Sequence, residues 1–137
     1  MMSTVKTSLF VPCLFVSLLT ANLAMAADDT RQELDAIAQQ VHALDARYPV
    51  KGISTEQQAQ SAIEESQNLQ NRLQNWYNQS ERHCYDIFFV NNCLREIKVE
   101  RRQYLPTLQR ISIEAKALQR QLRVMERDEE LARKQAK

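Results

Sequence analysis

The chain has 137 residues, of which 18 are basic and 17 are acidic. Such a balanced charge excludes the strongly basic class of nucleic-acid-binding proteins, and we expect no nucleic-acid partner. The sequence has one glycine and three prolines. Because a β-sheet needs frequent turns, this scarcity of turn-forming residues argues against a sheet and predicts an all-α fold with long helices.

Residues 1–26 have the pattern of a cleavable export signal. Lys6 precedes an apolar run at residues 9–19, and Ala24-Met25-Ala26 is a small-x-small cleavage site. The run is shorter than the roughly 20 residues of a spanning helix, so we expect no transmembrane segment in the mature chain. The expected product is a single helical domain at residues 27–137, located in the periplasm or, as the alternative, secreted.

The first helix of the mature chain is expected at residues 30–48. Thr30 and Glu33 have the spacing of a capping box, which marks a helix start, and Pro49 ends the helix. Apolar residues follow at alternating spacings of three and four, which predicts one buried stripe. This stripe consists of Leu34, Ile37, Val41, Leu44 and Tyr48.

A second helix is expected at residues 55–88. Ser54 or Thr55 caps its start, with Gln57 or Gln58 completing a capping box. Its predicted buried stripe consists of Ala59, Ala62 or Ile63, Ser66, Leu69, Leu73, Trp76, Ser80, Cys84 and Ile87 or Phe88.

Cys84 and Cys93 are expected to form a disulfide, because export leads to an oxidising compartment. In one straight helix their Cα atoms would lie about 13.5 Å apart, whereas a disulfide tolerates at most about 7 Å. The chain must therefore reverse direction between them. A redox site would favour Cys-x-x-Cys, and His83 offers only a third metal ligand, so we expect a structural bond without metal or cofactor.

A third helix is expected at residues 92–134, with a charged end that frays after Met125. Pro106 predicts either a kink or a helix restart. The predicted stripe consists of Leu94, Ile97, Arg101, Tyr104 or Leu105, Leu108, Ile111, Ala115, Leu118, Leu122 and Met125. Helices two and three are expected to form an elongated, coiled-coil-like antiparallel hairpin, with the shorter first helix packed on it.

The charge is unevenly distributed, because residues 27–83 have a net charge of −4 and residues 84–137 one of +4. We therefore expect the two halves to lie against each other. This arrangement would bring acidic residues of the first helix, Asp35 and Asp45, beside Arg110, Lys116, Arg120 and Arg123 of the third. Exposed pairs of this kind add little stability but disfavour a wrong register.

Two groups of residues near the expected reversal are candidates for binding a partner. We expect the aromatic residues near the reversal to form the core of the hairpin tip: Trp76, Tyr77, Tyr85, Phe88, Phe89 and, further along, Tyr104. Phe88 and Phe89 cannot both face the seam, since neighbouring helical residues point about 100° apart. The alternative is therefore that Phe89 is exposed at the tip as an anchor for a partner. The second group, Arg95, Lys98, Arg101 and Arg102, forms either a solvated helix face or a patch for phosphate headgroups or an acidic protein.

The segment Cys84-Tyr85-x-x-Phe88-x-Val90-Asn91-x-Cys93-Leu94 resembles a group of small exported helical proteins of Gram-negative bacteria, described as uncharacterised predicted coiled-coil proteins. The resemblance implies a cell-envelope location and a helical fold, and no activity.

We find no catalytic residues, because the sequence has no nucleophile triad and no glycine-rich phosphate loop. The expected function is therefore non-enzymatic: an interaction or scaffold component of the envelope that binds another envelope protein or a second copy of itself. The alternative is a holdase chaperone or envelope-stress protein that binds unfolded exported polypeptides.

Overall fold

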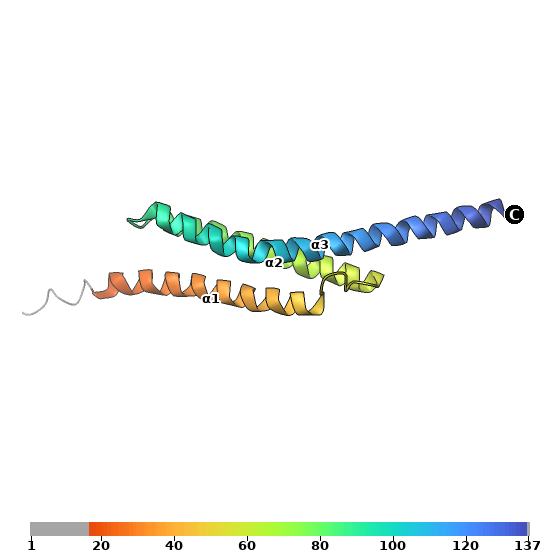
Figure 1. Cartoon of the computed structure of the whole chain (residues 1–137). Helices are drawn as coiled ribbons and strands as arrows, with labels where there is room; N and C mark the ends of the chain where they lie inside the picture. The colour runs from red at the N-terminus through yellow and green to blue at the C-terminus, as the bar shows by residue number, and fades with distance from the viewer. Residues whose placement is uncertain (1–16, 137) are drawn as a thin grey trace, which may run out of the picture.

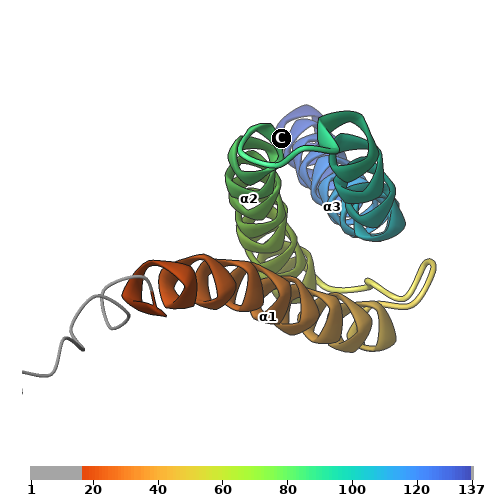
Figure 2. The same cartoon turned by 90° about the vertical axis from the view of Figure 1, so that its left-hand side faces the viewer.

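The computed structural model describes residues 17–136 and consists of three helices. These are α1 (Ser17–Arg47), α2 (Glu56–Tyr85) and α3 (Val90–Gln135). The described residues contain no strand, which confirms the all-α prediction. The molecule is elongated (Figure 1). Seen from its end, α2 and α3 lie side by side, and α1 lies against one side of this pair (Figure 2).

The start of α1 differs from the prediction. The described part of α1 starts at Ser17, so Thr30 lies inside the helix and is not its N-cap residue. A capping box marks a start only where the preceding chain leaves the helix, whereas residues 17–27 are rich in Leu and Ala, which favour helix. Residues 1–16 of the expected export signal lie outside the described residues.

The apolar stripe predicted for α1 is confirmed. All five of its side chains are buried: Leu34, Ile37, Val41, Leu44 and Tyr48. After Arg47 the chain turns at Pro49, where the amide of Gly52 donates to the carbonyl of Pro49 at 2.8 Å. A Cβ atom at Gly52 would lie 2.7 Å from Cγ of Pro49 and 2.9 Å from its carbonyl oxygen, so only glycine fits this turn. α1 is thereby folded back onto α2.

The predicted capping box at the start of α2 is also confirmed, with Thr55 as the N-cap. The amide of Gln58 donates to Oγ1 of Thr55 at 3.2 Å, and the amide of Thr55 donates to Oε1 of Gln58 at 3.3 Å. These bonds satisfy two amides that the first helical turn leaves without partners. The predicted seam of α2 is buried from Ala59 to Cys84.

α3 returns along α2. Gln70 donates to the carbonyl of Leu108, and Gln119 donates to Oε1 of Gln60. The buried face of α3 consists of Ile97, Leu108, Ile111, Ser112 and Ala115. Small residues in both helices, among them Ala59, Ala62, Ser66, Ser112 and Ala115, permit close approach of the two backbones.

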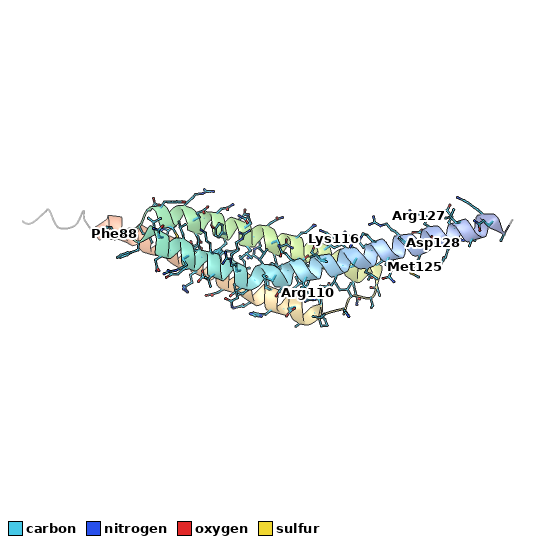
Figure 3. The ribbon with its side chains drawn as sticks, turned by 45° about the horizontal axis from the view of Figure 1, so that its top comes forward. Phe88, Arg110, Lys116, Met125, Arg127 and Asp128 are labelled. Atoms are coloured by element: carbon cyan, nitrogen blue, oxygen red, sulfur yellow. A yellow bond between two sulfur atoms is a disulfide. The ribbon has the colours of Figure 1, made fainter. Side chains whose placement is uncertain are left out.

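α3 is one continuous helix that contains Pro106 and does not restart there. The helix is bowed along its length (Figures 1 and 3), as expected where a proline removes a backbone hydrogen bond. Its last part extends past the end of α2, and Met125, Arg127 and Asp128 lie on this extension (Figure 3). Met125, predicted as a seam residue, is exposed because no helix lies opposite it.

Ion pairs join α1 to both other helices. Arg110 of α3 pairs with Asp45 at 2.6 Å, which was predicted, but Asp35 is exposed and makes no ion pair with a described residue. Arg72 of α2 donates to Glu33 at 2.8 Å, a contact that the sequence did not reveal. Such half-exposed pairs each contribute only a few tenths of a kcal/mol to the free energy of unfolding. Their main effect is therefore to fix the register of α1 against the other helices.

Candidate functional site

The candidate site is the turn between α2 and α3, which the disulfide Cys84–Cys93 closes. The Cα atoms of the two cysteines lie 5.5 Å apart, so the predicted reversal of the chain between them is confirmed. The side chain of Cys84 is fully buried. The amide of Asp86 donates to the carbonyl of His83, and the amides of Asn92 and Cys93 donate to the carbonyl of Phe89. The turn is therefore fixed by covalent and backbone contacts on both sides.

Both phenylalanines of this turn are exposed. Phe88 is 92% and Phe89 is 72% exposed, and their rings meet edge to face with centroids 5.0 Å apart. The exposure of Phe89 agrees with the alternative prediction for the tip, and its role as an anchor stays a prediction. The prediction of Ile87 or Phe88 as a seam residue is wrong, because α2 ends at Tyr85 and the helical phase does not continue beyond it. We call the exposed Phe88 and Phe89 the aromatic tip.

The remaining aromatic residues near the turn are split between core and surface. Trp76 and Tyr77 are buried, and Trp76 donates from Nε1 to the carbonyl oxygen of Thr30 at 3.0 Å. Tyr77 donates to Glu81, and burial, followed by the charge of Glu81, raises the pKa of its phenol. The expectation that the aromatic residues form the core of the tip is therefore wrong for Tyr85, Phe88 and Phe89, which are exposed.

The predicted basic residues have different environments. Arg95, Lys98 and Arg102 are exposed. Arg101 is half-buried, and its guanidinium lies 5.1 Å from the ring centroid of Tyr77. This cation–π contact engages Arg101 within the chain, so it is not available to a partner in the way that the other three residues are. The spacing of the four basic residues does not show that Arg101 differs from the other three. Its place in the predicted buried stripe of the third helix does.

A shallow cleft lies beside the disulfide, between α1 and the other two helices. It has a volume of about 150 Å³ and is lined by Leu34, Trp76, Ser80, His83 and Ile97, among others. Ser80 is 5% exposed, and its Oγ has no hydrogen-bond partner among the residues that the structure describes. Typical sites for drug-sized ligands start at roughly 300 Å³, so this cleft is small for such a ligand.

The chemistry available at the turn is limited. Among residues 29–136, no three His, Cys, Asp or Glu side chains are close enough together to hold a metal ion. The two cysteine sulfurs are bonded to each other, so neither is a free thiolate. None of the helices in residues 17–136 combines the length and the apolar character needed to cross a bilayer. What the turn presents to its surroundings is a set of exposed side chains, among them Phe88 and Phe89.

Comparison with known proteins found no matching family model, no matching curated protein and no matching solved structure. The resemblance to small exported helical proteins therefore stays an expectation from the sequence.

Proposed function

We propose that this chain is a non-enzymatic helical protein of the bacterial cell envelope that binds a second envelope protein through its aromatic tip. In this proposal residues 1–26 are removed on export to the periplasm. The mature chain then works as an elongated, coiled-coil-like antiparallel hairpin of α2 and α3, with the remainder of α1 packed on it. The proposed role is that of an interaction or scaffold component.

The exposure of the aromatic tip carries this proposal. Two neighbouring phenylalanines that are 92% and 72% exposed leave a large apolar area in water. Exposed apolar patches commonly mark interaction sites, and aromatic residues often dominate the energy of protein interfaces. Because the disulfide holds the turn in place before binding, the partner does not have to offset the entropy of ordering it.

Crosslinking in living cells tests the proposal. A photoreactive phenylalanine analogue is placed at Phe89, and the matched control carries it at Gln57, which is exposed at the opposite end of α2. The expected result is one heterologous product of defined mass from position 89 and none from position 57. Products confined to the chain itself at position 89, or equal products from both positions, would contradict a partner at the tip.

A holdase chaperone is the second candidate function, and the extension of α3 favours it. Beyond Gln119 this extension carries Leu122, which is half-buried, and Met125 and Leu131, which are both about half exposed. Flexible apolar side chains such as methionine suit a surface that binds many unrelated sequences. The holdase candidate requires the purified chain to suppress aggregation of several unrelated unfolded proteins, and Met125→Gln to weaken this activity more than Phe89→Gln. A scaffold would show no such suppression.

The location is tested separately by sequencing the amino terminus of the chain recovered from the periplasm. Processing after Ala26 gives a mature chain that begins at Ala27. Recovery of the intact amino terminus in the cytoplasm would contradict the proposed export.

A further inference from the structure

The outward-facing side of α3 carries basic side chains along most of its length. They are Arg95, Lys98, Arg102, Lys116, Arg120, Arg123 and Arg127, and all of them are exposed. At about 100° per residue, they all lie within about 60° of one direction around the helix axis. Four exposed apolar residues lie on the same side: Val99, Ile113, Val124 and Leu131. We call this surface the basic face of α3; it is about 50 Å long at 1.5 Å per residue.

Acidic side chains are excluded from the basic face. By the same helical geometry, the nearest carboxylates are Asp128 and Glu130, at its two edges close to the C-terminal end. Further round the helix, Glu96 accepts a hydrogen bond from Asn92, and Glu114 accepts from Arg110 and from the backbone of Lys51. The carboxylates of Glu96 and Glu114 are thus engaged within the chain and do not neutralise the face.

Most cations of the face have no ion-pair partner among the described residues. Lys98, Arg102, Lys116, Arg120 and Arg123 form no salt bridge with any described residue. This contrasts with Arg72 and Arg110, which lie elsewhere on the bundle and pair with α1. These five cations are therefore available to an external anion without breaking an internal ion pair, whereas Arg95 donates a hydrogen bond to Asn92.

The spacing of the apolar residues indicates what kind of anion covers the face. Val99, Ile113, Val124 and Leu131 are too far apart to form the continuous three-and-four stripe that a second helix needs. They are separate anchors surrounded by cations, and each is at least half exposed. A fluid layer of phosphate headgroups can rearrange around each cation while the apolar side chains enter its acyl boundary.

We propose that the basic face of α3 binds the surface of an anionic phospholipid bilayer, with α3 lying along the membrane plane. The interaction combines attraction between the cations and lipid phosphates with shallow insertion of the four apolar side chains. This proposal does not depend on the aromatic tip, and either one can fail without the other.

Vesicle sedimentation tests the proposal with the chain that begins at Ala27. This chain keeps every buried side chain of the described core, because these all lie at or after Leu34. Vesicles of equimolar phosphatidylglycerol and phosphatidylcholine are compared with vesicles of phosphatidylcholine alone. Binding is expected only to the anionic vesicles and is expected to weaken as sodium chloride is added.

The decisive variant removes three charges from the face: Arg102→Gln with Lys116→Gln and Arg120→Gln. The matched control removes three exposed charges elsewhere: Arg31→Gln with Lys51→Gln and Arg82→Gln. Both variants have the same net charge and keep the folded core. Each basic residue near an anionic surface raises the binding constant about fivefold, so the variant that lacks three of them should bind anionic vesicles about 100-fold more weakly than the parent. The control should stay within about threefold of the parent.

A third variant separates a membrane from other polyanions. Val99→Gln with Ile113→Gln should weaken vesicle binding but leave binding to heparin unchanged. Three results would overturn the proposal: equal binding to neutral vesicles, an equal loss in the charge-matched control, or no effect of Val99→Gln with Ile113→Gln on vesicle binding. The last result, combined with tight binding to heparin or duplex DNA, would assign the face to an acidic polymer.

Discussion

Removal of the disulfide is the most direct perturbation of the turn between α2 and α3. We consider the double substitution Cys84→Ala with Cys93→Ala in the chain from Ala27, where alanine avoids placing a hydroxyl at the fully buried position 84. The two cysteines are nine residues apart in sequence. In the chain-entropy treatment, a disulfide that closes a loop of this length restricts the unfolded chain and so raises the free energy of unfolding by about 2.6 kcal/mol.

A second contribution comes from packing. The Cys84 side chain has no exposed surface, and its replacement by alanine removes one buried sulfur atom, at a cost of about 1 kcal/mol. The double substitution is therefore expected to lower the free energy of unfolding by about 3.5 kcal/mol in total. For a domain of about 100 residues this corresponds to a fall in Tm of about 15–25 °C.

Thermal unfolding followed by far-ultraviolet circular dichroism measures this change. Helicity at low temperature should be close to that of the parent, because the seam from Ala59 to Leu73 does not include the disulfide. Reductant should lower the Tm of the parent by most of the same amount and leave the variant unchanged. A variant that melts within about 2 °C of the oxidised parent would refute the reasoning, because it would mean that the bond restricts nothing in the unfolded chain.

Three further predictions concern single side chains. Gly52→Ala should destabilise the chain by about 1–3 kcal/mol, because the new Cβ would lie within 2.9 Å of Pro49 atoms; urea unfolding measures it. Ser80→Ala should leave stability unchanged or raise it by up to about 1 kcal/mol, because the buried Oγ has no hydrogen-bond partner. Tyr77 should ionise above its ordinary pKa of 10.0, since burial and Glu81 raise the pKa of the phenol. Its contribution to stability is therefore complete below pH 10 and is lost as the pH rises through the raised pKa; absorbance at alkaline pH follows the ionisation.

Matched changes serve as controls for these predictions. Ser66→Ala removes a buried hydroxyl that donates to the carbonyl of Ile63 at 3.1 Å, so it should destabilise where Ser80→Ala does not. Tyr77→Phe should remove part of the late-ionising tyrosine absorbance, and Tyr48→Phe should remove another part, because burial and the charge of Glu65 raise the pKa of Tyr48 as well. Equal effects of the two serine variants would contradict the argument from the unpaired hydroxyl, and a late-ionising absorbance unchanged by Tyr77→Phe would contradict the raised pKa of Tyr77. A Gly52→Ala variant as stable as the parent would mean that the turn at Pro49 relaxes without cost.

The heptad spacing predicted the core because each helix buries one continuous stripe. The α1 residues from Leu34 to Tyr48 are all buried, and so are the α2 seam residues from Ala59 to Cys84. The prediction failed after Tyr85, since the disulfide fixes a turn whose geometry does not follow helical periodicity. It also failed at the start of α1, where the sequence before Thr30 continues the helix.

The basic face of α3 could have been predicted more fully than it was. The spacing of Arg95, Lys98 and Arg102 predicts the part of the face near the turn, and the same helical phase leads on to Lys116 and Arg120. These two were instead expected beside acidic residues of α1, with which they form no salt bridge among the described residues. By contrast, the pair of Arg72 with Glu33 depends on how α1 lies against α2, and periodicity within one helix carries no such information. The environment of Arg101 likewise required the position of Tyr77 on the neighbouring helix.

The continuity of α3 through Pro106 has a mechanical consequence. A helix of 46 residues without interruption spans about 69 Å at 1.5 Å per residue. Two objects attached at its opposite ends would be held apart by a distance that the bowed but uninterrupted backbone sets. The chain is therefore suited to act as a spacer of defined length, and inserting seven residues into the solvated extension beyond Gln119 would lengthen that spacing by about 10 Å without changing which side of the helix faces outward.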